Sequence, residues 1–129
     1  MFNIFRRNIG REYPEFESLN QYSDRDKYFW RTKKWYWHTG KEIAVIDMPR
    51  FITLDPWPQQ VFLDATGQKT IGEYIHFLAS KYSGKIPTEL DETVIHQIKK
   101  LLQESIISLS SEPQQLDPEI SNPVKLGKK

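Results

Sequence analysis

The residue types that most often bind metals or attack substrates are few in this sequence and lie far apart. Its three histidines, His38, His76 and His96, fall in different expected elements, and no two of them form an H-x-x-x-H pair. The chain has no cysteine, which removes disulfides, thiolate metal sites and cysteine nucleophiles together. We therefore expect neither a metal site nor a cofactor.

Three aspartates are the best candidates for acid–base catalysis. Asp47, Asp55 and Asp64 lie near one another in the sequence, and paired carboxylates can act as general acid and general base. Such pairs are nevertheless common in proteins, and Asp55 already suits the capping position of a helix. The sequence lacks the glycine-rich phosphate-binding motifs and the G-x-S-x-G motif. It thus predicts no catalytic residue and a protein that is not an enzyme.

Basic and aromatic residues alternate around residue 32 in a pattern that could bind a nucleic acid. The stretch Trp30-Arg31-Thr32-Lys33-Lys34-Trp35 belongs to a wider aromatic cluster. The cluster comprises Tyr28, Phe29, Trp30, Trp35, Tyr36 and Trp37. Aromatic rings can stack on bases while lysines contact phosphates, but a small domain also needs large side chains in its core. The pattern leaves open core packing, a protein or peptide interface, and a nucleic-acid surface.

Composition indicates one small domain. The chain has 129 residues, of which 38% are hydrophobic and 27% charged, enough for a single hydrophobic core. The net charge of +1 divides into +4 over residues 1–41 and −3 over the rest, so the whole chain has no strong attraction for polyanions. No signal peptide is indicated, and no run approaches the roughly 20 apolar residues of a membrane helix. We expect a soluble, cytoplasmic protein.

Three short strands are expected in the middle of the chain. A polar turn at Thr39-Gly40 separates residues 35–38 from residues 42–46, both of which favour β structure. A third run, residues 51–54, is bracketed by Pro49 and Pro56, which cannot donate a ladder hydrogen bond. The pattern predicts an antiparallel β-meander.

Three helices are expected to follow the strands. Asp55 and Pro56 begin a short one, and Thr70 with Glu73 forms a capping box that begins a clearer one. Asp91 opens the third, whose apolar stripe includes Val94, Ile98 and Leu101. Residues 106–109 are either a terminal strand or the end of that helix.

The sequence thus predicts an α+β fold with three parts. Residues 1–32 form a basic and aromatic N-terminal arm, residues 33–110 the folded domain, and residues 111–129 a disordered tail rich in serine, glutamine and proline. Several aromatic and aliphatic residues of the arm could still dock onto the core.

The order of elements between about Trp35 and Ser110 resembles the PqqD family of pyrroloquinoline-quinone biosynthesis and its relatives. The resemblance lies in the stretch from Glu42 to Asp55, then Val61-Phe62-Leu63, and Gly67 with Thr70-Ile71 three residues later. It continues through Glu73-Tyr74-Ile75 and Leu78-Ala79-Ser80-Lys81-Tyr82. The sequence departs from the family at Pro56-Trp57-Pro58 and in its long arm.

The resemblance implies a winged-helix-like domain that binds a peptide by adding it as a strand to the sheet edge. Carried over residue by residue, that edge would be Phe51, Ile52, Thr53 and Leu54, and the facing helix would contribute Val94, Ile98 and Leu101. The module would present a precursor peptide to a modifying enzyme of the radical SAM type.

The alternative hypothesis is a winged-helix protein that binds nucleic acid through its third helix. Asp91, Glu92 and Glu104 offset Lys99 and Lys100 on that helix, so the sequence favours a peptide or protein partner. Whether the chain forms a homodimer is left open.

Overall fold

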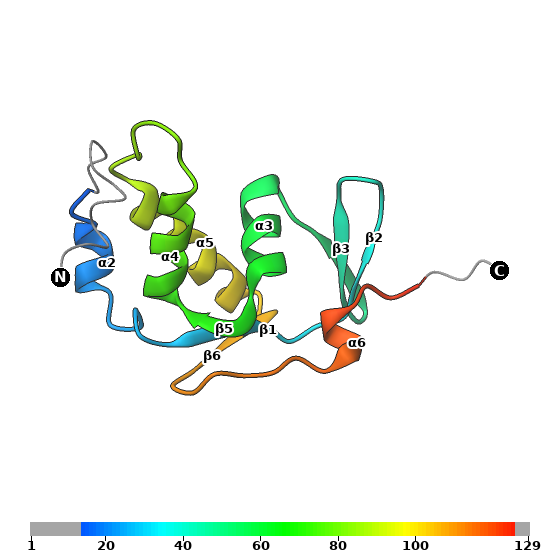
Figure 1. The fold of residues 1–129 in the computed structure, drawn as a ribbon. Coiled ribbons are helices and arrows are strands. Elements are labelled where there is room, and N and C mark those ends of the chain that lie inside the picture. Colours follow the sequence, from blue (N-terminus) through cyan, green and yellow to red (C-terminus); the bar gives the residue numbers. More distant parts are fainter. Residues whose placement is uncertain (1–13, 126–129) are drawn as a thin grey trace.

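The predicted α+β class is confirmed in a computed structural model, which describes residues 14–125. The described residues form two three-stranded antiparallel sheets and five helices (Figure 1). In chain order they are α2 (Glu17–Gln21), β1 (Tyr28–Arg31), β2 (Trp35–Trp37), β3 (Ile43–Asp47), β4 (Arg50–Thr53), α3 (Pro56–Asp64), β5 (Thr66–Thr70), α4 (Ile71–Ser80), α5 (Leu90–Gln103), β6 (Ile107–Ser110) and α6 (Pro118–Ser121). The finer winged-helix-like description stays a prediction.

The predicted meander is present, with strand order β2-β3-β4, and is called the meander sheet below. Trp35 pairs with Val45, and Val45 in turn pairs with Ile52, so these three side chains share one face. The Thr39 hydroxyl accepts the backbone N–H groups of Lys41 and Glu42 at 3.1 and 3.0 Å, which closes the first turn. Local turn chemistry therefore produces this sheet, as the sequence indicated.

The three predicted helices α3, α4 and α5 are also present. Thr70 and Glu73 form the capping box at the start of α4: the Thr70 hydroxyl accepts the Glu73 N–H at 3.1 Å, and the Glu73 carboxylate accepts the Thr70 N–H at 2.9 Å. Asp55 precedes α3 in an extended conformation, with Pro56 in the first turn, but its side chain makes no capping bond. Helix α5 begins at Leu90, one residue before Asp91.

A second sheet, β5-β1-β6, joins three segments that are distant in the sequence. Its central strand is β1, which the sequence assigned to the arm, and β6 resolves the alternative at residues 106–109 in favour of a strand. Phe29 and Arg31 of β1 are buried, as are Phe16 and Leu19 near α2. Residues 14–32 are therefore part of the folded body, and the remainder of the predicted arm lies outside the described residues.

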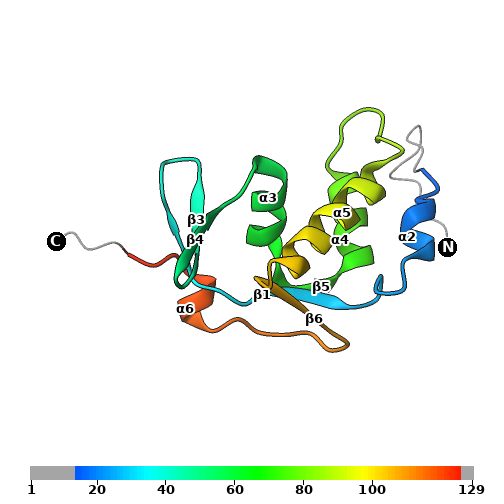
Figure 2. The same cartoon turned by 180° about the vertical axis from the view of Figure 1, so that it is seen from behind.

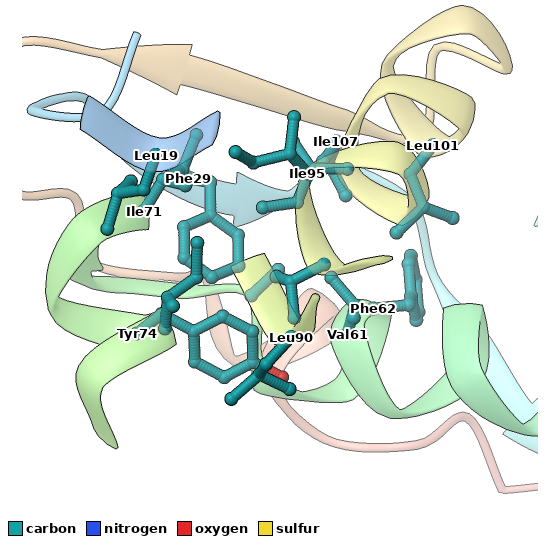
Figure 3. Packing of buried hydrophobic residues seen from close by; sticks show 14 of the residues in the cluster. Leu19, Phe29, Val61, Phe62, Ile71, Tyr74, Leu90, Ile95, Leu101 and Ile107 are labelled. Atoms are coloured by element: carbon teal, nitrogen blue, oxygen red, sulfur yellow. The ribbon is translucent and has the colours of Figure 1, made fainter. Parts of the chain in front are cut away.

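The core lies between the β5-β1-β6 sheet and helices α3, α4 and α5. Figure 3 shows the ring of Phe29 beside that of Tyr74, and the ring centroids are 5.1 Å apart at a tilt of 55°. Phe62 of α3 and Ile71 of α4 are fully buried in the same cluster. Burial raises the pKa of Tyr74, and so does its hydroxyl's 2.7 Å hydrogen bond to Asp64.

The short helix α2 is held by a buried carboxylate. Asp91, 2% exposed in the first turn of α5, accepts the backbone N–H of Leu19 at 2.9 Å. Phe16, the residue before α2, supplies no side-chain cap, so a residue 72 positions away satisfies this amide. The contact fastens the described N-terminal residues to α5.

Replacing Asp91 with alanine is expected to lower the free energy of unfolding by about 2 kcal/mol, because a buried charge-assisted hydrogen bond is lost and the Leu19 N–H is left without its partner. Urea denaturation measures the change. The matched control is Glu92→Ala, since Glu92 lies in the same helical turn but is exposed, and we expect a change below about 0.5 kcal/mol. Equal effects of the two substitutions would show that the helix dipole, and not the bond to Leu19, is what Asp91 contributes.

The disordered tail predicted for residues 111–129 is not confirmed in its described part. Residues 111–125 return from β6 along the base of the molecule to the meander sheet and include α6 (Figure 2). Polar and proline-rich composition predicts disorder because such a segment buries little apolar area. Here backbone groups anchor the segment instead: the Trp35 indole N–H donates to the Ile120 carbonyl at 2.9 Å, and the Gln114 N–H donates to the Gly67 carbonyl at 2.9 Å.

Candidate functional site

The predicted binding edge, Phe51 to Leu54, lies at one side of the meander sheet. Among the described residues, β4 pairs with β3 on one side and with no strand on the other. Residues alternate along an antiparallel strand in whether their N–H and C=O groups face the partner strand. About half of the β4 backbone groups therefore point away from β3 and are available to a further strand.

A hollow of about 210 Å³ lies beside this edge. Its lining residues come from β4 and the start of α3 on one side and from the end of α5 on the other. They are Ile52, Thr53, Leu54, Asp55, Pro58, Lys100, Leu101 and Glu104. Three of the four predicted edge residues thus contact the hollow, whose floor is apolar and whose rim carries both charges.

The structure separates the three predicted helix residues. Val94 and Ile98 have no exposed surface and belong to the core, whereas Leu101, 1% exposed, lines the hollow. The sequence pattern selected all three because they share the apolar stripe of α5, and it treated Lys100 and Glu104 only as charges that offset one another on that helix. Glu104 follows Leu101 by three positions and Lys100 by four, the spacings of neighbours on a helix, so helical spacing through Glu104 could have found both.

A chain of charged groups fastens the turn between β3 and β4 to its surroundings. Asp47 bonds to Arg50 and to the Lys33 ammonium, the latter at 3.1 Å, and Arg50 also reaches the Glu104 carboxylate at 3.2 Å. The hydrogen bonds from Arg50 and then Lys33 lower the pKa of Asp47, and its bond to Asp47 raises the pKa of Arg50. The bond from Arg50 to Glu104 joins the first residue of the free strand to the residue that follows α5.

Phe51 lies on the outer face of the meander sheet. It is 57% exposed, and its ring meets that of Tyr36 edge-on with centroids 6.5 Å apart. Met48 in the adjoining turn is 70% exposed. A strand added to β4 would therefore have an exposed apolar side chain beside it on this face and the hollow on the other.

The candidate acid–base residues have separate structural partners. Asp47 is engaged in the ion pairs just described, and Asp55 precedes α3 without a side-chain cap. Asp64 accepts hydrogen bonds from Tyr74 at 2.7 Å and Gln60 at 3.0 Å. Within residues 14–125, His, Asp and Glu side chains form no group of three that could hold a metal ion.

The basic and aromatic stretch is largely occupied by contacts within the molecule. Arg31 and Trp35 are buried at 5% exposure each, Lys33 pairs with Asp47, and Lys34 lies 3.5 Å from Glu119. Of the wider cluster, Phe29 is buried and Trp37 is 45% exposed. This arrangement favours core packing over stacking on bases.

Comparison with known proteins gave no match to a family model, a curated protein or a solved structure. In the part of the chain that the structure describes, none of the helices is both long and apolar enough to cross a membrane.

Proposed function

We propose that the protein is a non-catalytic binding module that takes up an extended peptide by strand addition to β4. The observation that carries the proposal is the open edge of β4 next to the hollow it shares with α5. Main-chain hydrogen bonds to a strand edge supply affinity for any extended segment, and adjacent apolar sites select among side chains.

The hollow supports a peptide ligand over a small molecule. Its volume of about 210 Å³ falls below the roughly 300–1,000 Å³ of small-molecule pockets. Ile52, Leu54 and Leu101 offer it an apolar floor, and Lys100 and Glu104 can pair with charged residues on either side. This chemistry suits one apolar side chain of an extended peptide, flanked by charged ones.

The PqqD resemblance extends the proposal to a biological role. In it, the bound segment is a precursor peptide that the module presents to a modifying enzyme of the radical SAM type in the cytosol. The winged-helix-like fold is part of the same proposal. Binding of nucleic acid through α5 is the competing function, and the closeness of Glu104 to Lys100 on that helix gives it less support.

Proline substitution in β4 tests strand addition. One of Ile52 and Thr53 donates its N–H to β3 and the other points its N–H outward. Proline at the position whose N–H points outward removes no hydrogen bond to β3, so we expect that variant, one of Ile52→Pro and Thr53→Pro, to keep the wild-type melting temperature. The same variant should bind peptide at least about 10-fold more weakly. The readout is an NMR titration of labelled protein with synthetic peptides encoded by short reading frames beside its gene.

The controls are Ile52→Val and Thr53→Val, which keep the backbone N–H and should preserve binding. Shifts along Phe51–Leu54 and the end of α5 are expected in the titration. If the fold-neutral proline variant binds as tightly as the wild type, or if no peptide shifts these residues, strand addition at β4 is wrong. Retention on heparin with a steep dependence on salt would favour the nucleic-acid function instead.

A further inference from the structure

Residues 114–125, called the C-terminal segment below, lie across the folded body and contact it at three places. At the first, the Gln114 N–H donates to the Gly67 carbonyl at 2.9 Å, and the Gln68 side chain donates to the Gln114 carbonyl at 2.7 Å. A Cβ atom at Gly67, whose φ is +83°, would lie 2.5 Å from the Gln114 oxygen. Gly67 therefore provides both the backbone conformation and the space for this crossing.

The second place is built around Arg31 and Trp35. The Arg31 guanidinium donates to the Ile120 carbonyl at 3.2 Å and the Ser121 carbonyl at 3.1 Å, and the Trp35 indole donates to Ile120 at 2.9 Å. Burial lowers the pKa of Arg31, and the nearby Asp64 carboxylate opposes that shift. Three N–H groups of two buried side chains thus donate hydrogen bonds to backbone carbonyls of the C-terminal segment.

The C-terminal segment also reaches the outer edge of β2. In the strand order β2-β3-β4, β2 lies opposite to β4, and the Val124 N–H donates to the Trp35 carbonyl at 2.7 Å. Trp37 faces Pro123 and Val124 across a hollow of about 570 Å³. One edge of the meander sheet therefore already has an extended chain beside it.

The same segment contributes nothing to the hydrophobic core. Helix α6 has no buried residue, and neither the core cluster nor the partly buried residues packed against it extend beyond Leu109 among the described residues. Removing the segment would expose the polar donors of Arg31 and Trp35 to water; of the core cluster, Trp35 is the member whose hydrogen bonds to the segment the structure records. The segment is therefore held mainly by hydrogen bonds of its backbone and not by burial of its own side chains.

We infer that Arg31, Trp35 and the edge of β2 form a second binding site for polypeptide, and that the C-terminal segment is its tethered ligand. The site accepts a short helical turn that offers two consecutive carbonyls, followed by an extended residue with a free N–H. All three features are main-chain groups, so a separate peptide can supply them. This inference involves the β2 edge and is independent of the function proposed for β4.

The inference predicts that the segment binds when it is no longer covalently attached. A specific protease site is placed between Glu112 and Pro113, both exposed, and the folded full-length chain is cleaved there. The probe is a fluorescent synthetic peptide of residues 113–125, followed by anisotropy. We expect the cleaved chain to retain its own segment on gel filtration or to take up the probe at 1:1. The uncleaved chain should bind at least about 10-fold more weakly, because its tethered segment competes at millimolar effective concentration.

Single-group variants identify the site. A probe with Val124→Pro lacks the N–H that meets Trp35, and Trp35→Phe in the body removes the indole donor, so each should weaken binding about 5-fold. Trp57→Phe is the control, since Trp57 is an exposed tryptophan on α3 and is not among the groups described above as bonded to the segment.

Three results would overturn the inference. In one, the body stays folded by circular dichroism yet neither retains the segment nor binds the probe. In another, the body unfolds on cleavage, which makes the segment integral to the fold. In the third, binding is insensitive to Trp35→Phe and is lost in the fold-neutral β4 proline variant, which assigns the probe to the β4 edge.

Discussion

Replacing Phe29 with alanine is expected to lower the free energy of unfolding by about 4 kcal/mol, the range found for phenylalanine-to-alanine changes in protein cores. Phe29 is 1% exposed in the central strand of the β5-β1-β6 sheet, and its ring packs on Tyr74. The substitution leaves a cavity where β1 meets α4. Because domains are stable by only about 5–15 kcal/mol, the loss is a large fraction of the total.

Urea denaturation and thermal melting measure this effect, and a fall in melting temperature of about 15 °C corresponds to it. The matched control is Phe77→Ala, because Phe77 of α4 is 38% exposed and contacts the ammonium groups of Lys69 and Lys81 at 4.6 and 4.8 Å. We expect the control to lose less than about 1 kcal/mol. Similar losses for the two variants would contradict the placement of β1 in the core.

Replacing Arg31 with methionine is expected to lower the free energy of unfolding by about 3 kcal/mol, the upper range for hydrogen bonds of a charged group. The guanidinium donates to Leu63 at 2.7 Å and Phe62 at 3.4 Å, near the end of α3, as well as to Ile120 and Ser121. Methionine is apolar and of similar length, but it loses the guanidinium contacts over the rings of Trp35 and Phe62, at 5.6 and 5.9 Å to the ring centroids, and leaves these carbonyls without their donor. The end of α3 and the C-terminal segment should loosen together.

Hydrogen exchange separates this local effect from global destabilisation, since amides near residues 62–66 and 120–124 should lose protection first. Arg31→Lys is expected to recover part of the loss, because one ammonium cannot reach acceptors on two segments with the geometry of a guanidinium. Arg25→Met is the control: Arg25 is exposed, and its guanidinium donates to the Tyr22 carbonyl at 3.2 Å. If Arg31→Met is no more destabilising than Arg25→Met, the four carbonyl contacts contribute little.

The candidate site was predictable from sequence only in part. The strand from Phe51 could be placed at an edge because Pro49 and Pro56 bracket it and the family resemblance supplied a role. The residues of α5 across the hollow could not be predicted in this way. An apolar stripe on a helix indicates which residues face the core, but it does not indicate which residues line the rim of a hollow. Val94 and Ile98 lie in that core, and Lys100 and Glu104 at the rim come from the polar side of the same helix.

The sequence itself determined the local features, whose stabilising groups lie within a few residues of one another. The Thr70 and Glu73 capping box and the turn at Thr39 satisfy backbone groups within three positions, so residue types alone predict them. The tertiary structure alone decided the second sheet and the role of Arg31. Strands β1, β5 and β6 come from distant parts of the chain, and Arg31 donates to carbonyls 31 to 90 positions away. Every residue has the same main-chain acceptor, so no sequence pattern indicates which carbonyls Arg31 will bind. A basic residue near aromatic residues is typical of a surface, and only the tertiary structure shows that Arg31 is buried.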